Sequence, residues 1–143
     1  MAYWERNTLI LGLASMLGGA FYFGIVTYLS LSAGAIIMPN IWIWLGYIIL
    51  QVAMSMGGIL LVGRNHLPEV KDLHGGEDER DRIIRNRSEA MNGHLAAAFV
   101  FACLALWFWH QSPALLFHSI VAAMILGEVG RCLFQFYSYN RAY

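Results

Sequence analysis

The chain is short of charge. Asp, Glu, Lys and Arg make up only 13% of its residues, whereas 59% are hydrophobic. A soluble domain carries about 25% charged residues, so roughly half of the usual polar surface is missing. This shortage excludes an ordinary soluble domain and favours a protein that faces lipid.

Other absences narrow the function classes. The net charge is zero, and no basic tract with interleaved aromatic residues indicates a nucleic-acid partner. The sequence also lacks a nucleophile elbow, a phosphate-binding loop and a zinc-helix motif. We therefore expect a protein that is not an enzyme and carries no cofactor.

Cysteine is scarce as well. Cys103 and Cys132 form neither a metal-binding spacing nor a disulfide framework, and both fall in apolar segments, so we interpret them as small buried hydrophobes. A metal site at His66 and His74 stays open, because acidic residues lie between them, but the spacing is unspecific.

Four long apolar stretches fill most of the chain. Each is near the roughly 20 residues that cross a bilayer core, if the third borrows its more polar start. The link between the first and second stretches is short, and so is the link between the third and fourth. Short links are typical of antiparallel hairpins. The sequence predicts one all-α integral membrane domain, 1–143, with two helical hairpins. The expected transmembrane helices are 8–31, 41–62, 78–110 and 114–136.

All nine basic residues fall on one side of this arrangement. They precede the first helix, occupy the 63–77 link and the start of the third helix, or lie near the end of the fourth. The two short links contain none. The positive-inside rule then places both termini and the 63–77 link in the cytoplasm. The nine are Arg6, Arg64, Lys71, Arg80, Arg82, Arg85, Arg87, Arg131 and Arg141.

The first apolar stretch is rich in small residues. Spacings of four allow a second backbone to approach closely. We expect these residues to pack inside the bundle, and contact with a second copy or a partner is the alternative. The residues concerned are Gly12, Ser15, Gly18, Gly19 and Gly24.

Half of all the charge lies in residues 77–89, which hold five acids and four bases. The acids come first, as suits the start of a helix. Three interpretations stay open: a solvated face with weak ion pairs, a docking surface for a partner, or an anionic lipid contact. The residues concerned are Asp78, Glu79, Arg80, Asp81, Arg82, Arg85 and Arg87.

Ionisable residues also occur within the fourth apolar stretch. Glu128 and Arg131 are three apart and therefore share a helix face. If the second hairpin turns near residues 111–112, His94 and Asn92 come level with them. An ionisable residue at membrane depth costs about 2.5–3.5 kcal/mol on insertion scales, so we expect these four to form one buried polar layer. It is either a structural clamp or a proton or ligand site.

Several of these segments carry a resemblance. The run Asp78-Glu79-Arg80-Asp81-Arg82 with Ile84 and Arg87-Ser88, followed by Gly127-Glu128-Val129 and Tyr139-Asn140-Arg141-Ala142, resembles a family of small bacterial proteins. Members have four helices in the inner membrane and no established function. The resemblance implies a bacterial plasma-membrane location and the same fold.

The expected function follows from the small-residue helix, the concentrated charge and the absence of a catalytic constellation. We expect an accessory or assembly subunit, or a regulator, of a larger membrane complex, with the bilayer and a protein partner or second copy as its contacts. The alternative is a small proton-coupled transporter that uses Glu128. A weaker alternative is a cofactor-binding membrane protein that uses His94 or the link histidines.

Overall fold

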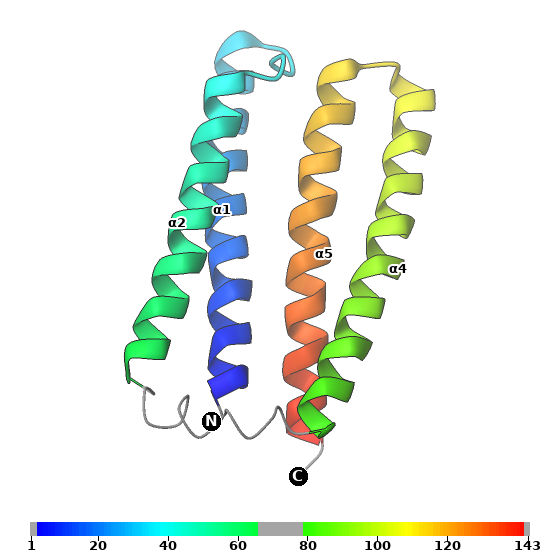
Figure 1. Cartoon of the computed structure of the whole chain (residues 1–143). Helices are drawn as coiled ribbons and strands as arrows, with labels where there is room; N and C mark the ends of the chain where they lie inside the picture. Colours follow the sequence, from blue (N-terminus) through cyan, green and yellow to red (C-terminus); the bar gives the residue numbers. More distant parts are fainter. Residues whose placement is uncertain (1–2, 66–78, 142–143) are drawn as a thin grey trace.

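Four long helices form the described part of the chain. The computed structural model describes residues 3–65 and 79–141, and the regular structure in these two ranges is entirely helical. Each helix has a stretch long and apolar enough to cross a membrane, which confirms the all-α, four-helix prediction. The helices are α1 (Tyr3–Ala33), α2 (Ile41–Asn65), α4 (Glu79–His110) and α5 (Pro113–Arg141) (Figure 1).

The predicted link falls mostly on residues that the structure does not describe. Residues 63–65 continue α2. Lys71, Asp78 and the link histidines His66 and His74 lie outside the described residues, so the predictions made for them stay predictions.

Local sequence fixes the two hairpin turns. Asn40 Oδ1 accepts a hydrogen bond from the amide of Trp42 at 2.9 Å, so Asn40 caps the start of α2. Ser112 Oγ caps α5 in the same way, at 3.3 Å from an amide of its first turn, and Pro113 begins the helix, where proline is favoured. Gly34 follows the end of α1 with φ +66°, a left-handed conformation that glycine adopts without strain.

The helix α4 begins with the charged segment and runs unbroken into the apolar one. Ile84 and Ser88 are buried near its start, and Ser88 is fully inaccessible, with its hydroxyl donating to the carbonyl of Arg85 at 2.7 Å. The charged start of α4 is thus part of the packed structure on one side.

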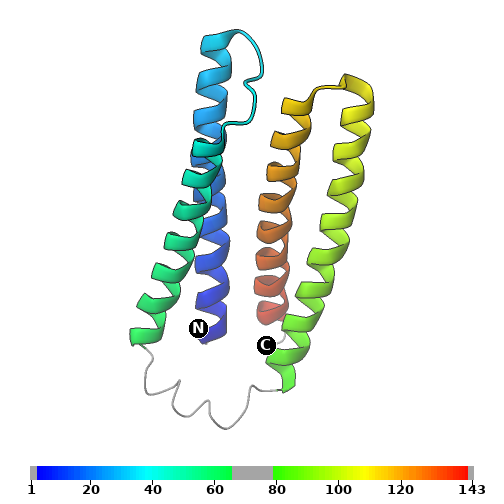
Figure 2. The same cartoon turned by 45° about the horizontal axis from the view of Figure 1, so that its top comes forward.

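The four helices lie in the order α2, α1, α5, α4. The helix α1 packs against both α2 and α5, and α5 packs against α4, as Figures 1 and 2 show. No residue of the apolar stretch of α2, Ile41–Leu61, is buried. The central pair therefore supplies the core, and the outer helices expose apolar side chains such as Trp42 and Phe101, 78% and 72% exposed.

The central contact joins α1 to α5. Its buried cluster consists of Tyr22 and Val26 from α1 with Val121 and Ile125 from α5. Gly19 allows the close approach, because a Cβ there would lie 2.9 Å from Cγ2 of Ile125.

The other small residues of α1 face different neighbouring helices. A Cβ at Gly12 would lie 3.1 Å from Cβ of Cys132 on α5, and one at Gly18 would collide with Gln51 on α2. Gly24 has no neighbour within 4 Å of the same position. The small residues therefore serve helix packing within the chain, except Gly24, which lies on an exposed part of α1.

Apart from Glu128 and Arg131 within α5, the charged residues of the described ranges lie at one end of the molecule. The start of α1, the end of α2, the start of α4 and the end of α5 share this charged end (Figure 1). The turns at the opposite end, 34–40 and 111–112, contain no Asp, Glu, Lys or Arg.

Candidate functional site

An ion pair on α5 forms the centre of the candidate site. Arg131 Nε donates to Glu128 Oε2 at 3.0 Å, and Nη2 donates to Oε1 at 2.5 Å. Arg131 Nη1 donates to Oε1 of the buried Gln135 at 3.2 Å. The Glu128 side chain is 32% exposed and the Arg131 side chain 16%. The two side chains meet on one helix face, as their spacing predicts.

The structure brings Asn92 to this region but leaves His94 apart. Asn92 Oδ1 lies 3.1 Å from the place that a Cβ on Gly127 would take. His94 is exposed, and its Nδ1 lies 2.8 Å from the carbonyl of Ala90. The two residues are about 200° apart around the helix axis. A similar position along the axis therefore does not place both side chains on the face of α4 that packs against α5.

Asn92 and Glu128 belong to a groove that touches all four helices, which we call the four-helix groove. It has a volume of about 350 Å³. Its walls carry a hydroxyl, two amides, a phenol and the Glu128 carboxylate among apolar side chains. The lining residues are Ser15, Tyr47, Gln51, Asn92, Ala96, Ala123, Met124, Ile125, Gly127 and Glu128.

Gln51 supplies the polar group of α2 in this groove. Its Nε2 donates to Ser15 Oγ at 3.0 Å, and its Oε1 is buried with no hydrogen-bond partner. The absent side chain of Gly18 makes room for the amide. Sequence reasoning overlooked Gln51, although it is the one carboxamide in the apolar stretch of α2.

A second polar link lies nearer the uncharged end. The Tyr22 hydroxyl is 2.8 Å from His118 Nδ1, and His118 Nε2 is 3.1 Å from the carbonyl of Ile37. Because a carbonyl only accepts, Nε2 carries the hydrogen and Nδ1 accepts from Tyr22 in the neutral ring. The imidazole thus joins α1, the first turn and α5, and both of its nitrogens are used.

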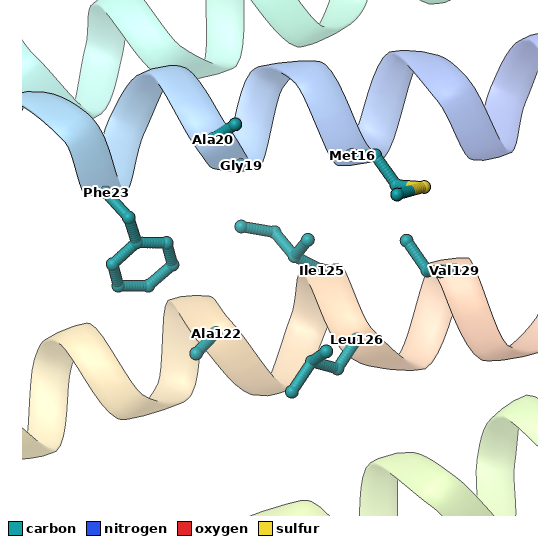
Figure 3. Close-up of a pocket in the computed structure, with 8 residues that line it drawn as sticks. All are labelled: Met16, Gly19, Ala20, Phe23, Ala122, Ile125, Leu126 and Val129. Carbon is teal, nitrogen blue, oxygen red and sulfur yellow. The ribbon is translucent and has the colours of Figure 1, made fainter.

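Another groove, between α1 and α5, is wholly apolar in its side chains. It has a volume of about 490 Å³, and Figure 3 shows Met16 and Phe23 of α1 facing it from one side, with Ile125 and Val129 of α5 on the other. It offers no side chain capable of acid–base, nucleophilic or metal chemistry.

Metal ligands do not gather in the described ranges 3–65 and 79–141. No group of three or more His, Cys, Asp or Glu side chains there could hold an ion. Cys103 and Cys132 are both free and buried.

The four arginines at the charged start of α4 lie in two different places. Arg82 lies 4.0 Å from Glu79, and Arg85 lies 3.8 Å from Glu89, in exposed ion pairs. Arg80 and Arg87 instead line a groove against α5, and Asp81 is partly buried.

Comparisons of this chain with protein families, with curated proteins and with solved structures find no match. The resemblance to small bacterial membrane proteins therefore stays a prediction.

Proposed function

We propose that this chain is a non-enzymatic integral membrane protein, and that it serves as an accessory or assembly subunit, or a regulator, of a larger membrane complex. The observation that carries the proposal is the four-helix groove. It receives a transmembrane helix from a partner protein or from a second copy of the chain.

Insertion into a membrane is supported by the surface of the helices. Large apolar side chains are widely exposed, and Trp42 and Trp109, 78% and 85% exposed, lie near the uncharged ends of α2 and α4. Tryptophan prefers the interface between lipid and water. We place the charged end in the cytoplasm of a bacterial cell, by the positive-inside rule and the resemblance.

The depth of the polar groups argues for a covered groove. At about 1.5 Å per residue, Gln51 lies about 15 Å from the start of α2 and Glu128 about 22 Å from the start of α5. Both then fall inside a hydrocarbon core about 30 Å thick. Lipid tails cannot hydrogen-bond to an amide or a carboxylate, so a helix with its own polar group is a better occupant than lipid.

Native mass spectrometry of gently solubilised membranes tests assembly. Ala96 lines the groove, whereas Ala97 is exposed beside it on α4 without lining it. Ala96→Trp should fill part of the groove and release the partner or second copy, and Ala97→Trp should leave the complex intact. A wild-type chain that is monomeric under all gentle conditions, or a complex that survives both substitutions equally, would contradict the proposal.

A proton-coupled transporter that uses Glu128 is the second candidate. It is favoured by the partial exposure of the carboxylate in the groove. Under this candidate, Glu128→Gln abolishes flux in proteoliposomes while the protein stays folded in the membrane. Normal flux by that variant would eliminate it, and assembly without any flux would favour the accessory role.

A further inference from the structure

The groove at the charged end joins arginines that are scattered in the sequence. It lies between the start of α4 and the end of α5 and has a volume of about 410 Å³. Arg80 and Arg87 approach it from α4, and Arg141 approaches it from α5. No acidic side chain of the described residues lines it. We call it the arginine groove.

Two acids of the same helix segment form ion pairs outside the arginine groove. Glu79 pairs with Arg82, and Glu89 pairs with Arg85, and none of these four lines the arginine groove. The segment is nearly balanced in charge when read along the sequence. In three dimensions these two ion pairs lie outside the arginine groove, whereas Arg80 and Arg87 line it.

The remaining lining has the composition of a lipid contact. Tyr137 and Ser138 add hydroxyl groups, and Ile83, Ile84 and Phe134 form apolar walls. The guanidinium of Arg141 lies 4.9 Å from the centre of the Tyr137 ring. Such a stacked arginine is held in place and still directs hydrogen-bond donors outward.

The position of the arginine groove fits the level of lipid headgroups. Phe134 lies about 32 Å along α5 from Pro113, at about 1.5 Å per residue. A hydrocarbon core is about 30 Å thick, so Phe134 lies at its edge. At the same rise per residue, Arg87 lies about 34 Å from the uncharged end of α4, Arg141 about 42 Å from that of α5 and Arg80 about 45 Å from that of α4. The arginines therefore lie about 4 to 15 Å beyond the edge of the core. Basic pockets between transmembrane helices at this level bind phosphate-bearing lipid headgroups.

We propose that the arginine groove binds the headgroup of an anionic phospholipid, with the phosphate on Arg80, Arg87 and Arg141 and an acyl chain along the apolar wall. The inference rests on the membrane insertion proposed above and is independent of the partner helix.

The test is the retention of phosphatidylglycerol by the full-length protein in neutral detergent, counted by native mass spectrometry against phosphatidylcholine. The variant Arg80→Gln/Arg87→Gln should bind phosphatidylglycerol at least about tenfold more weakly. The control, Arg82→Gln/Arg85→Gln, removes the same charge from the same helix and should bind within about twofold of wild type. Arg141→Gln supplies a weakening variant on the other helix, should the first fail to fold by circular dichroism.

Three results would overturn the inference. The first is that both double variants weaken the binding of phosphatidylglycerol equally. The second is that the protein retains phosphatidylcholine as well as phosphatidylglycerol. The third is that millimolar inorganic phosphate displaces the lipid, which would indicate a site for free phosphate. A chain absent from the membrane fraction would instead overturn the proposed function. A chain that inserts but retains no phosphatidylglycerol would overturn the lipid site alone.

Discussion

Arg131 donates two hydrogen bonds to Glu128, one turn of α5 away, and Glu128 in turn lines the four-helix groove. Replacing Arg131 with Gln leaves the carboxylate without its cation. We expect this change to lower the free energy of unfolding in detergent by about 2–3 kcal/mol.

The double-mutant cycle isolates that pair. Glu128→Gln removes the carboxylate that Arg131→Gln leaves unpaired. The double variant Glu128→Gln/Arg131→Gln should therefore lower the free energy of unfolding by less than the sum of the two single substitutions. Strictly additive effects would mean that the ion pair contributes nothing specific.

The link between Tyr22 and His118 makes a separate prediction about stability. Tyr22→Phe removes the donor to Nδ1 of a buried imidazole and should lower the free energy of unfolding by about 1 kcal/mol. Tyr28→Phe is the matched control, since Tyr28 is on the same helix and 72% exposed. It should change stability by less than about 0.5 kcal/mol, and equal effects from the two would refute the role given to the hydrogen bond.

Two glycines of α1 should respond in opposite directions to the same substitution. Gly24→Ala meets open space and should stabilise the protein by about 0.5–1 kcal/mol, because alanine restricts the unfolded chain. Gly19→Ala meets Ile125 and should destabilise it by about 1–3 kcal/mol through overpacking. Chemical denaturation in one detergent compares them, and the same sign for both would count against the close contact between α1 and α5.

Features that depend on local spacing were predictable from the sequence. The apolar stretches, the hairpin turns and the shared face of Glu128 and Arg131 all depend on residues within a few positions of one another. Helix geometry alone relates such residues, so no knowledge of the packing was needed.

Features that depend on rotation about a helix axis were not predictable. The mirror relation across the second hairpin gives the depth of His94 but not the side of α4 from which it projects, and the structure leaves it exposed. Tyr22 and His118 are 96 positions apart, and Gln51 meets Ser15 across 36. These pairings follow from the contacts of α1 with α2 and α5, which a single sequence does not specify.

The same reasoning explains the charged segment. In the sequence, its acids and bases balance, which weakens the prediction of a lipid site. Arg80 and Arg87 are seven positions apart and share a face of α4 toward α5, and Arg82 and Arg85, which pair with Glu79 and Glu89, lie outside that groove. Only the packing of α4 on α5 separates the two groups.

The central claim, that a partner helix covers the four-helix groove, is tested most directly by site-specific photo-crosslinking in intact membranes. A photoreactive residue at Met124, exposed on the groove, is compared with one at Phe101, equally exposed on α4 but outside it. The proposal predicts a discrete protein adduct from position 124, which Ala96→Trp abolishes, and none from position 101. Adducts with lipid alone at both positions would contradict it.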